Sequence, residues 1–229
     1  MNQPNLETLE KSLNLKFKNQ TLLLRALTHR SYLNENPGYK GVSNERLEFL
    51  GDAILQFLTS EYIFDQYDDY PEGELTNLRS KLVNTESLGS EASRLDLGQH
   101  LLISKGEKEV AQESVHILAN TFEALLGAIY LDFGLDTSRA FLIKELLYKT
   151  DSIIQNGDLK DAKSLYQEKT QEQFGVTPSY KVLKDEGPDH DKTFTVGAYL
   201  GNKLIAKGTG SSKRRAQQDA AQKALNSAK

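Results

Sequence analysis

The sequence of 229 residues contains no cysteine. It therefore has neither a disulfide framework nor a thiolate zinc site, which favours a reducing compartment, so we expect a cytoplasmic protein. Any metal ion would be bound mainly by oxygen ligands or by the four histidines. The chain also lacks an apolar run of the roughly 20 residues that cross a bilayer. Its first residues, MNQPNLETLE, lack the basic and apolar regions of a signal peptide. We therefore expect no membrane partner.

Positive charge is scarce overall, with a formal net charge of −4, which by itself argues against a nucleic-acid binder. The distribution of charge is more informative than its sum. Residues 1–150 carry 15 Lys and Arg against 22 Asp and Glu, whereas the remaining residues carry 13 against 10. Within residues 203–229 the count is seven basic to one acidic. The chain therefore has an acidic first part and a basic end, which is an asymmetry of charge that can be interpreted.

Hydrophobic periodicity changes once along the chain. Helical spacing of apolar residues predicts amphipathic helices near 5–13, 20–34, 44–66, 74–95, 111–132 and 136–150. After a polar break, the pattern predicts a helix at 161–175, strands at 178–185, 192–200 and 202–208, and a helix at 211–228. The sequence thus predicts an α+β multidomain protein: an all-helical domain at 1–150, a linker at 151–158, and a small α-β-β-β-α domain at 159–229.

The stretch NERLEFLGD, residues 44–52, places acids on a segment that otherwise resembles a core helix. Glu48 and Asp52 are four residues apart, so their side chains lie on one face of that helix. Like charges at this spacing destabilise an isolated helix by roughly a few tenths of a kcal/mol. A divalent cation bound between them would offset the repulsion.

A second buried-looking segment, residues 117–132, carries Asn120 and Glu123 on one face. Each of the two segments also has an interior glycine, Gly51 and Gly127, which costs about 1 kcal/mol relative to alanine and favours a close helix–helix approach. If the helices cross there, their polar groups converge. Oxygen ligands of this kind suit Mg²⁺, and Mg²⁺ beside nucleic acid suggests phosphodiester hydrolysis. The alternative is that these acids lie on solvated helix faces, as most such acids do.

Four blocks together resemble the catalytic domain of ribonuclease III: NERLEFLGDAIL, ALTHRSY, EGELTNLRSKLV and ILANTFEALLGAIYLD. The resemblance implies an all-helical domain that forms a homodimer and cleaves double-stranded RNA with Mg²⁺, Mn²⁺ being a substitute ion. It further implies 5′-phosphate and 3′-hydroxyl ends and a role in RNA processing, such as maturation of rRNA precursors.

Carried over by motif position, the resemblance implies catalytic roles for Glu45, Glu48, Asp52, Asn120 and Glu123, all but Glu45 binding metal. Asn120 departs from the pattern, because the family usually has aspartate there. Phe49 matches an aromatic residue of the dimer interface in relatives. An ordinary core position is equally compatible with the sequence at Phe49.

The last predicted helix begins with serines suited to capping, followed at once by Lys213 and Arg214. Positive side chains, free N–H groups and the helix dipole together favour phosphate. The 159–229 region resembles a double-stranded RNA-binding domain, which implies a set of RNA contacts. These are Gln167, Glu168, Pro188, His190, Ser212, Lys213, Arg214 and Gln217. Gln217 stands where relatives often have lysine, so one phosphate contact is expected to be weak.

The rival hypothesis is a non-catalytic protein of the same fold that binds double-stranded RNA, with Asn120 as a sign of decay. A decayed site should have lost several acids, whereas Glu45, Glu48, Asp52 and Glu123 all remain. A helical protein–protein module explains neither these acids nor the basic helix start. The sequence therefore favours the enzyme.

Overall fold

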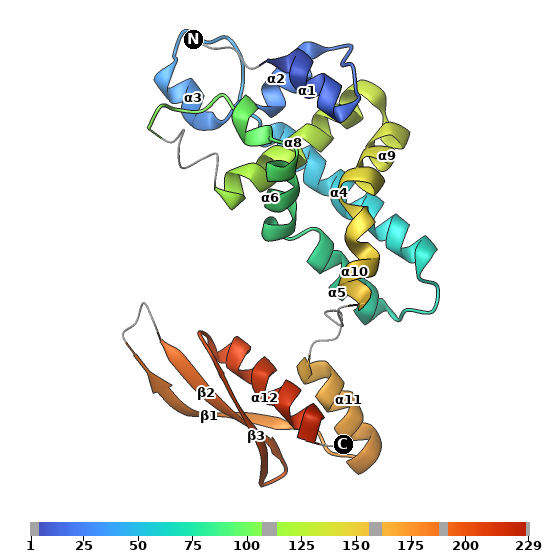
Figure 1. The fold of residues 1–229 in the computed structure, drawn as a ribbon, viewed down its shortest axis with the longest axis vertical. Coiled ribbons are helices and arrows are strands. Elements are labelled where there is room, and N and C mark those ends of the chain that lie inside the picture. Colours follow the sequence, from blue (N-terminus) through green and yellow to red (C-terminus); the bar gives the residue numbers. More distant parts are fainter. Residues whose placement is uncertain (1–4, 107–113, 156–161, 188–191, 228–229) are drawn as a thin grey trace. The chain divides into compact units, whose positions relative to one another are not determined.

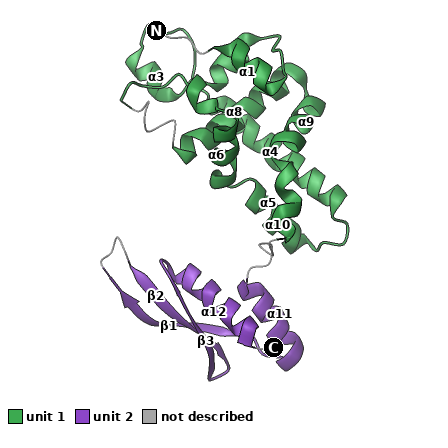
Figure 2. Ribbon diagram, viewed as in Figure 1, with its two compact units in different colours: residues 1–156 green, residues 157–229 purple. Residues whose placement is uncertain are grey.

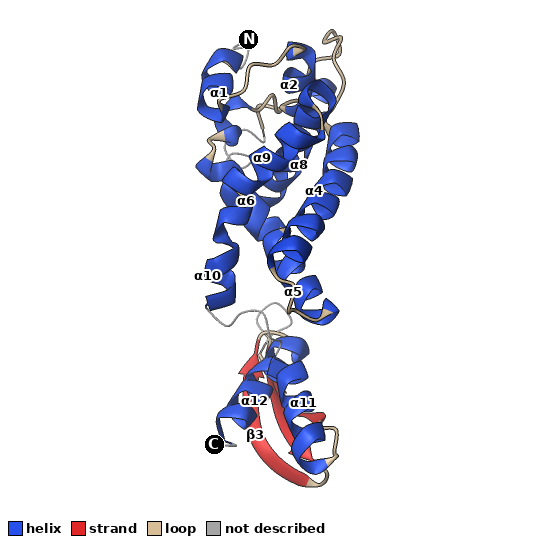
Figure 3. Cartoon of the chain, turned by 90° about the vertical axis from the view of Figure 1, so that its right-hand side faces the viewer, coloured by secondary structure: helices blue, strands red, loops and turns tan. Residues whose placement is uncertain are grey.

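The computed structural model describes residues 5–106, 114–155, 162–187 and 192–227 (Figure 1). The chain divides into two compact units, Met1–Asn156 and Gly157–Lys229 (Figure 2). The first is built of helices, and the second combines a sheet with two helices (Figure 3). Within the described ranges, no helix has the length and apolar character needed to span a membrane.

Unit 1 is arranged around one central helix, α8, whose side chains are almost all buried from Leu118 to Ile129. Helices α2, α4 and α6 pack against α8 and cover most of its apolar residues, while Val115 and Leu131 near its two ends stay partly exposed. The described elements are α1 (Leu6–Leu13), α2 (Gln20–Ala26), α3 (Arg30–Glu35), α4 (Glu45–Gln66), α5 (Glu72–Leu82), α6 (Thr85–Arg94), η1 (Leu97–His100), α8 (Val115–Phe133), α9 (Leu135–Glu145), η2 (Leu147–Lys149) and α10 (Thr150–Gln155).

The all-helical prediction for this unit is confirmed, but the single helices predicted at 20–34 and 74–95 are wrong, because each segment holds two. At the first break, the imidazole of His29 accepts a hydrogen bond from a backbone N–H at the start of α3. At the second, Asn84 accepts one of 2.8 Å from the Ser87 N–H. Both side chains act as N-caps, and a new helix begins at each.

The predicted linker at 151–158 also differs from the structure. Its first residues continue α10 and belong to unit 1, because Ile153 and Ile154 are half-buried where α10 packs against α5. The hydroxyl of Tyr67 donates a 2.8 Å hydrogen bond to Asp151. The rest of the predicted linker lies outside the described residues.

Unit 2 has the predicted α-β-β-β-α order. Its elements are α11 (Ala162–Phe174), β1 (Ser179–Glu186), β2 (Thr193–Leu200), β3 (Lys203–Gly210) and α12 (Lys213–Ser227). The strands form an antiparallel sheet in the order β1-β2-β3, and both helices cover one face of it (Figure 3). Gly201 has φ +60° in the β2–β3 turn, a conformation that glycine adopts at no steric cost. Small alanines on α12 pack closely against β3 at Gly208.

Candidate active site and nucleic-acid surface

Helices α4 and α8 cross at a pair of glycines. A Cβ atom on Gly51 would overlap the backbone carbonyl of Glu123, and one on Gly127 would overlap the carbonyl of Leu47. The two backbones approach this closely because neither helix has a side chain at the crossing point. The crossing therefore aligns the polar edge of α4 with that of α8.

The polar groups beside this crossing interact with one another. Burial raises the pKa of Glu123 to about 7, and the charges on Asp52 and Glu48 add to the effect. Burial also raises the pKa of Glu48, helped by Glu45 and Asp52, while a hydrogen bond from the Asn120 side chain opposes the shift. The solvated-face alternative therefore fits the exposed Asp52 but not the half-buried Glu123.

Glu45 lies at the edge of this cluster, in the first turn of α4. Its carboxylate accepts a 2.8 Å hydrogen bond from the Ser43 hydroxyl and lies 3.6 Å from the Arg30 guanidinium, with both side chains of the ion pair largely exposed. An exposed pair of this kind contributes little to stability, on the order of 0–1 kcal/mol. Glu45 influences the cluster through its negative charge, which helps to raise the pKa of Glu48.

The donor chemistry of the cluster suits a hard cation. Carboxylate oxygens and an amide oxygen, with waters completing the shell, are the ligands that Mg²⁺ prefers. In the described part of the chain, however, no three His, Asp or Glu side chains stand close enough together to hold a metal ion as placed. Burial is the main cause of the raised pKa values of Glu48 and Glu123, and repulsion from the neighbouring carboxylates adds to it. The residue types fit the predicted ion, and the assignment of ligands stays a prediction.

A second feature of α4 is an exposed aromatic face. Phe49 is 81% exposed, Phe57 52% and Phe64 67%, so the alternative that Phe49 is a core residue is wrong. A cavity of about 510 Å³ opens beside this face between α4 and α5, lined in part by Phe57 and Phe64. The sequence analysis missed these two residues. Their spacing from Phe49, eight and then seven residues, returns close to the same helix face and could have indicated them.

Most of the predicted RNA contacts of unit 2 lie on its helices or next to a helix start. Gln167 and Glu168 are exposed on α11, and Lys213 and Arg214 are exposed in the first turn of α12. The Ser212 hydroxyl accepts a 3.2 Å hydrogen bond from a backbone N–H in this turn, so Ser212 caps α12 as its sequence position predicts.

The other three predicted RNA contacts are Gln217, Pro188 and His190. Gln217 lies on α12 and accepts a 2.8 Å hydrogen bond from Lys163, a residue that the sequence analysis did not single out. Pro188 and His190 fall outside the described residues, so the structure gives no position for the predicted loop contacts.

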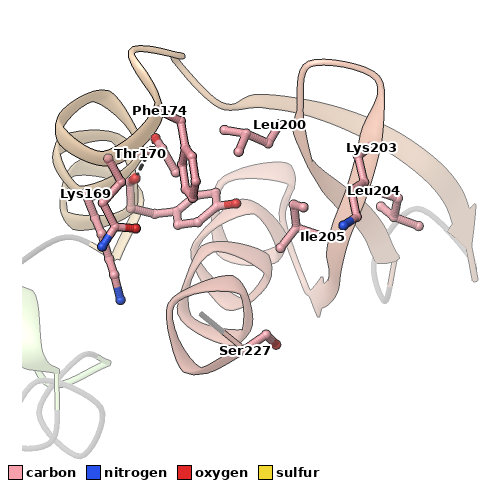
Figure 4. A pocket seen from close by; sticks show the side chains of 10 residues that line it. Lys169, Thr170, Phe174, Leu200, Lys203, Leu204, Ile205 and Ser227 are labelled. Atoms are coloured by element: carbon pink, nitrogen blue, oxygen red, sulfur yellow. Dashed lines mark hydrogen bonds between the residues drawn. The ribbon is translucent and has the colours of Figure 1, made fainter. Parts of the chain in front are cut away.

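Unit 2 also has a cavity of about 430 Å³, between the end of α11, the β2–β3 hairpin and the end of α12 (Figure 4). The side chains of Phe174, Leu200 and Ile205 line it. None of the described RNA-contact candidates is among the residues that line it. The cavity and the predicted RNA surface are therefore separate features of unit 2.

Comparison with known families matches both units. The model of the Ribonuclease-III-like family matches residues 19–150, which include α4, α8 and their crossing. The chain belongs to the ribonuclease III family. The double-stranded RNA binding motif matches residues 162–227, which are α11 to α12. The chain is thus a ribonuclease III-type endoribonuclease with a helical nuclease unit followed by an RNA-binding motif.

Relatives extend over nearly the whole chain. Ribonuclease 3 of Syntrophobacter fumaroxidans is 44% identical over 226 residues, which cover 96% of this chain and 93% of that protein. Ribonuclease 3 of Nitratiruptor is 43% identical, covering 96% and 95%. A structure of the ribonuclease III nuclease domain from Campylobacter jejuni is 40% identical with a TM-score of 0.57, covering 61% of this chain and 94% of that one. That structure is described as showing flexibility in a region involved in dimer formation.

Proposed function

We propose that this ribonuclease III family member is a Mg²⁺-dependent homodimer that hydrolyses phosphodiester bonds in double-stranded RNA in the cytoplasm. The observation that carries the proposal is the interaction of Glu48, Asp52, Asn120 and Glu123 at the glycine crossing. A double-stranded RNA binding motif on the same chain supplies the substrate class. The proposed products carry 5′-phosphate and 3′-hydroxyl ends, and RNA processing such as rRNA maturation is the proposed cellular setting.

Two helices would provide the metal ligands. Glu48 and Asp52 project from α4, and Asn120 and Glu123 project from α8. A bound Mg²⁺, or Mn²⁺ in its place, would activate water and stabilise the charge that develops on the scissile phosphate. Before binding, Asn120 orients Glu48 by a hydrogen bond, and its neutral amide adds no further repulsion to the carboxylates.

Unit 2 would hold the substrate by shape and charge. Double-stranded RNA-binding domains span about 16 base pairs and contact 2′-hydroxyls and phosphates rather than base sequence. The exposed Lys213 and Arg214 at the start of α12 suit phosphates, because the helix dipole and free N–H groups there add to their positive charge. Gln167 and Glu168 on α11 are proposed minor-groove contacts.

The aromatic face of α4 is the proposed dimer interface. Phe49, Phe57 and Phe64 leave a large apolar area in water, and such patches on a folded domain usually mark an interaction surface. The cavity between α4 and α5 lies beside them. Burial of these rings against a second copy would remove that area from water.

The proposal is tested by incubating the full chain with a long RNA duplex, with and without Mg²⁺, and resolving the products on a gel. We expect shorter duplex fragments only when Mg²⁺ or Mn²⁺ is present, and intact single-stranded RNA of the same length as the control. Duplex binding without cleavage at any concentration of either ion would support the rival, a non-catalytic RNA-binding protein.

A further inference from the structure

The cavity of unit 2 has largely apolar walls on elements that face one another. Its volume of about 430 Å³ lies within the range of roughly 300–1,000 Å³ that is typical of small-molecule sites in proteins. Phe174 of α11 lines one side, and Leu200 and Ile205 of the β2–β3 hairpin line another (Figure 4). The size and the lining of the cavity therefore suit the apolar body of a small molecule.

A buried tyrosine forms part of the cavity wall. Tyr166, on α11, lines the cavity and is only 2% exposed. None of the described residues forms a hydrogen bond with its hydroxyl group, and burial alone raises the pKa of this phenol. A polar group that is buried without a partner costs free energy. A ligand that accepts a hydrogen bond from this hydroxyl would remove that cost.

The charged residues that line the cavity are both positive. They are Lys169 of α11 and Lys203 of β3, and none of the lining residues is acidic. Lys203 is exposed and forms no ion pair with any residue of the described ranges, so its ammonium is free to bind an anion. A ligand with a negatively charged end is therefore complementary to this cavity.

We propose that the cavity binds a small aliphatic carboxylate, with the chain against Phe174 and Ile205 and the carboxylate at the Lys203 ammonium. Burial of the chain would remove apolar area from water. The Tyr166 hydroxyl and the Lys203 ammonium both donate hydrogen bonds, and a carboxylate can accept them with either oxygen. The inference is independent of the proposed function, because none of the described RNA-contact candidates lines the cavity.

The test uses octanoate, a straight-chain carboxylate, as the probe. The full chain is isotope-labelled for NMR and titrated with octanoate in the absence of RNA. We expect saturable shifts of the amide resonances of the lining residues, with Leu204 and Ile205 among them. Octanol has the same chain without the charge, and octyltrimethylammonium has the opposite charge. Both should bind about tenfold more weakly, the scale of one hydrogen bond between charged groups.

Two substitutions test the polar contacts one at a time. Lys203→Met keeps the apolar stem and removes the charge, so it should weaken octanoate binding about tenfold and leave octanol binding unchanged. Tyr166→Phe keeps the ring and removes only the hydroxyl, so it should weaken octanoate binding about fivefold. Lys207→Met changes an exposed lysine of β3 that does not line the cavity, and this matched control should bind octanoate as the unaltered chain does.

Thermal unfolding without ligand separates binding from folding. The Tyr166 hydroxyl has no hydrogen bond to a described residue to lose, so Tyr166→Phe should unfold at or above the temperature of the unaltered chain. The inference would be overturned if octanoate caused no saturable shift at the cavity, or if octanol bound as tightly as octanoate. Equal octanoate affinity in Lys203→Met and the unaltered chain would overturn it as well. Each of these results would leave the proposed function intact.

Discussion

Gly51 of α4 lies directly against the backbone carbonyl of Glu123 in α8, so closely that a side chain on Gly51 would overlap it. The backbones of α4 and α8 nearly touch at this point. Glu48 and Asp52 of α4 therefore lie close enough to Glu123 of α8 for their charges to interact. Burial at this contact raises the pKa of Glu123, and repulsion from the charges of Asp52 and Glu48 raises it further.

Glu123→Gln should reduce cleavage of duplex RNA by about a hundredfold or more, the scale of removing a group that stabilises transition-state charge. The variant keeps nearly the same shape but loses the carboxylate. Duplex affinity should stay near that of the unaltered chain, because RNA binding is assigned to unit 2. Single-turnover cleavage and filter binding measure the two effects. Glu86→Gln, an exposed acid on α6, is the control. Normal cleavage by Glu123→Gln at limiting Mg²⁺ would show that the site is assigned wrongly.

The metal-free protein should lose stability as Glu123 ionises. Its pKa is about 7 in the folded chain, above its ordinary 4.5, so the folded state holds this proton more tightly than the unfolded state. The contribution of this group is greatest below pH 4.5 and falls as the pH rises to 7. Relative to the unaltered chain, Glu123→Gln should therefore gain about 1–2 kcal/mol of unfolding free energy at pH 8, allowing for solvent screening. Urea unfolding with a chelator at pH 4.5 and pH 8 measures the difference, and an equal difference at the two pH values would contradict the prediction.

Asn120 should set the Mg²⁺ requirement of cleavage. Its amide oxygen binds a cation more weakly than a carboxylate does, so Asn120→Asp should lower the Mg²⁺ concentration needed for half-maximal rate. Asn120→Ala should raise it, because both the oxygen and the hydrogen bond to Glu48 are lost. Cleavage rates of the three proteins across a Mg²⁺ titration decide the order. Cleavage by Asn120→Asp alone would identify the natural chain as an inactivated nuclease.

Phe49→Arg combined with Phe64→Arg should convert a dimer into monomers. Both rings are mostly exposed in the single chain, so the fold should survive, whereas two charges buried between copies cost several kcal/mol. Sedimentation equilibrium gives the mass, and circular dichroism checks the helices. Leu131→Arg, at a half-exposed apolar position on α8, is the control and should stay dimeric. A monomeric unaltered chain would remove the dimer from the proposed function.

A shortened chain ending at Asn156 should fold and lose most duplex affinity. Unit 1 ends there as a compact unit, and α10 packs against α5 within it. We expect retained helicity with slow cleavage at low salt, because the nuclease unit then binds RNA without the basic surface of unit 2. An unfolded product in circular dichroism would show that unit 1 depends on unit 2.

Much of this organisation could be predicted from local sequence. The two hydrophobic periods separate the helical unit from the α-β-β-β-α unit, since each period follows from the geometry of one element. The interior glycines Gly51 and Gly127 indicated a helix crossing, and the structure has it. The family motifs indicated the enzyme class. All of these signals lie within a few neighbouring residues of the chain.

Tertiary structure alone decided which side chains are buried and which distant ones meet. Phe49 fits a core helix by sequence and is exposed in the fold, because none of the described elements of unit 1 covers that face of α4. Lys163 and Gln217, 54 residues apart, meet only because α11 and α12 pack side by side on one sheet. The spacing of residues within one helix fixes the face on which a side chain lies, but the packing of separate elements determines what covers that face.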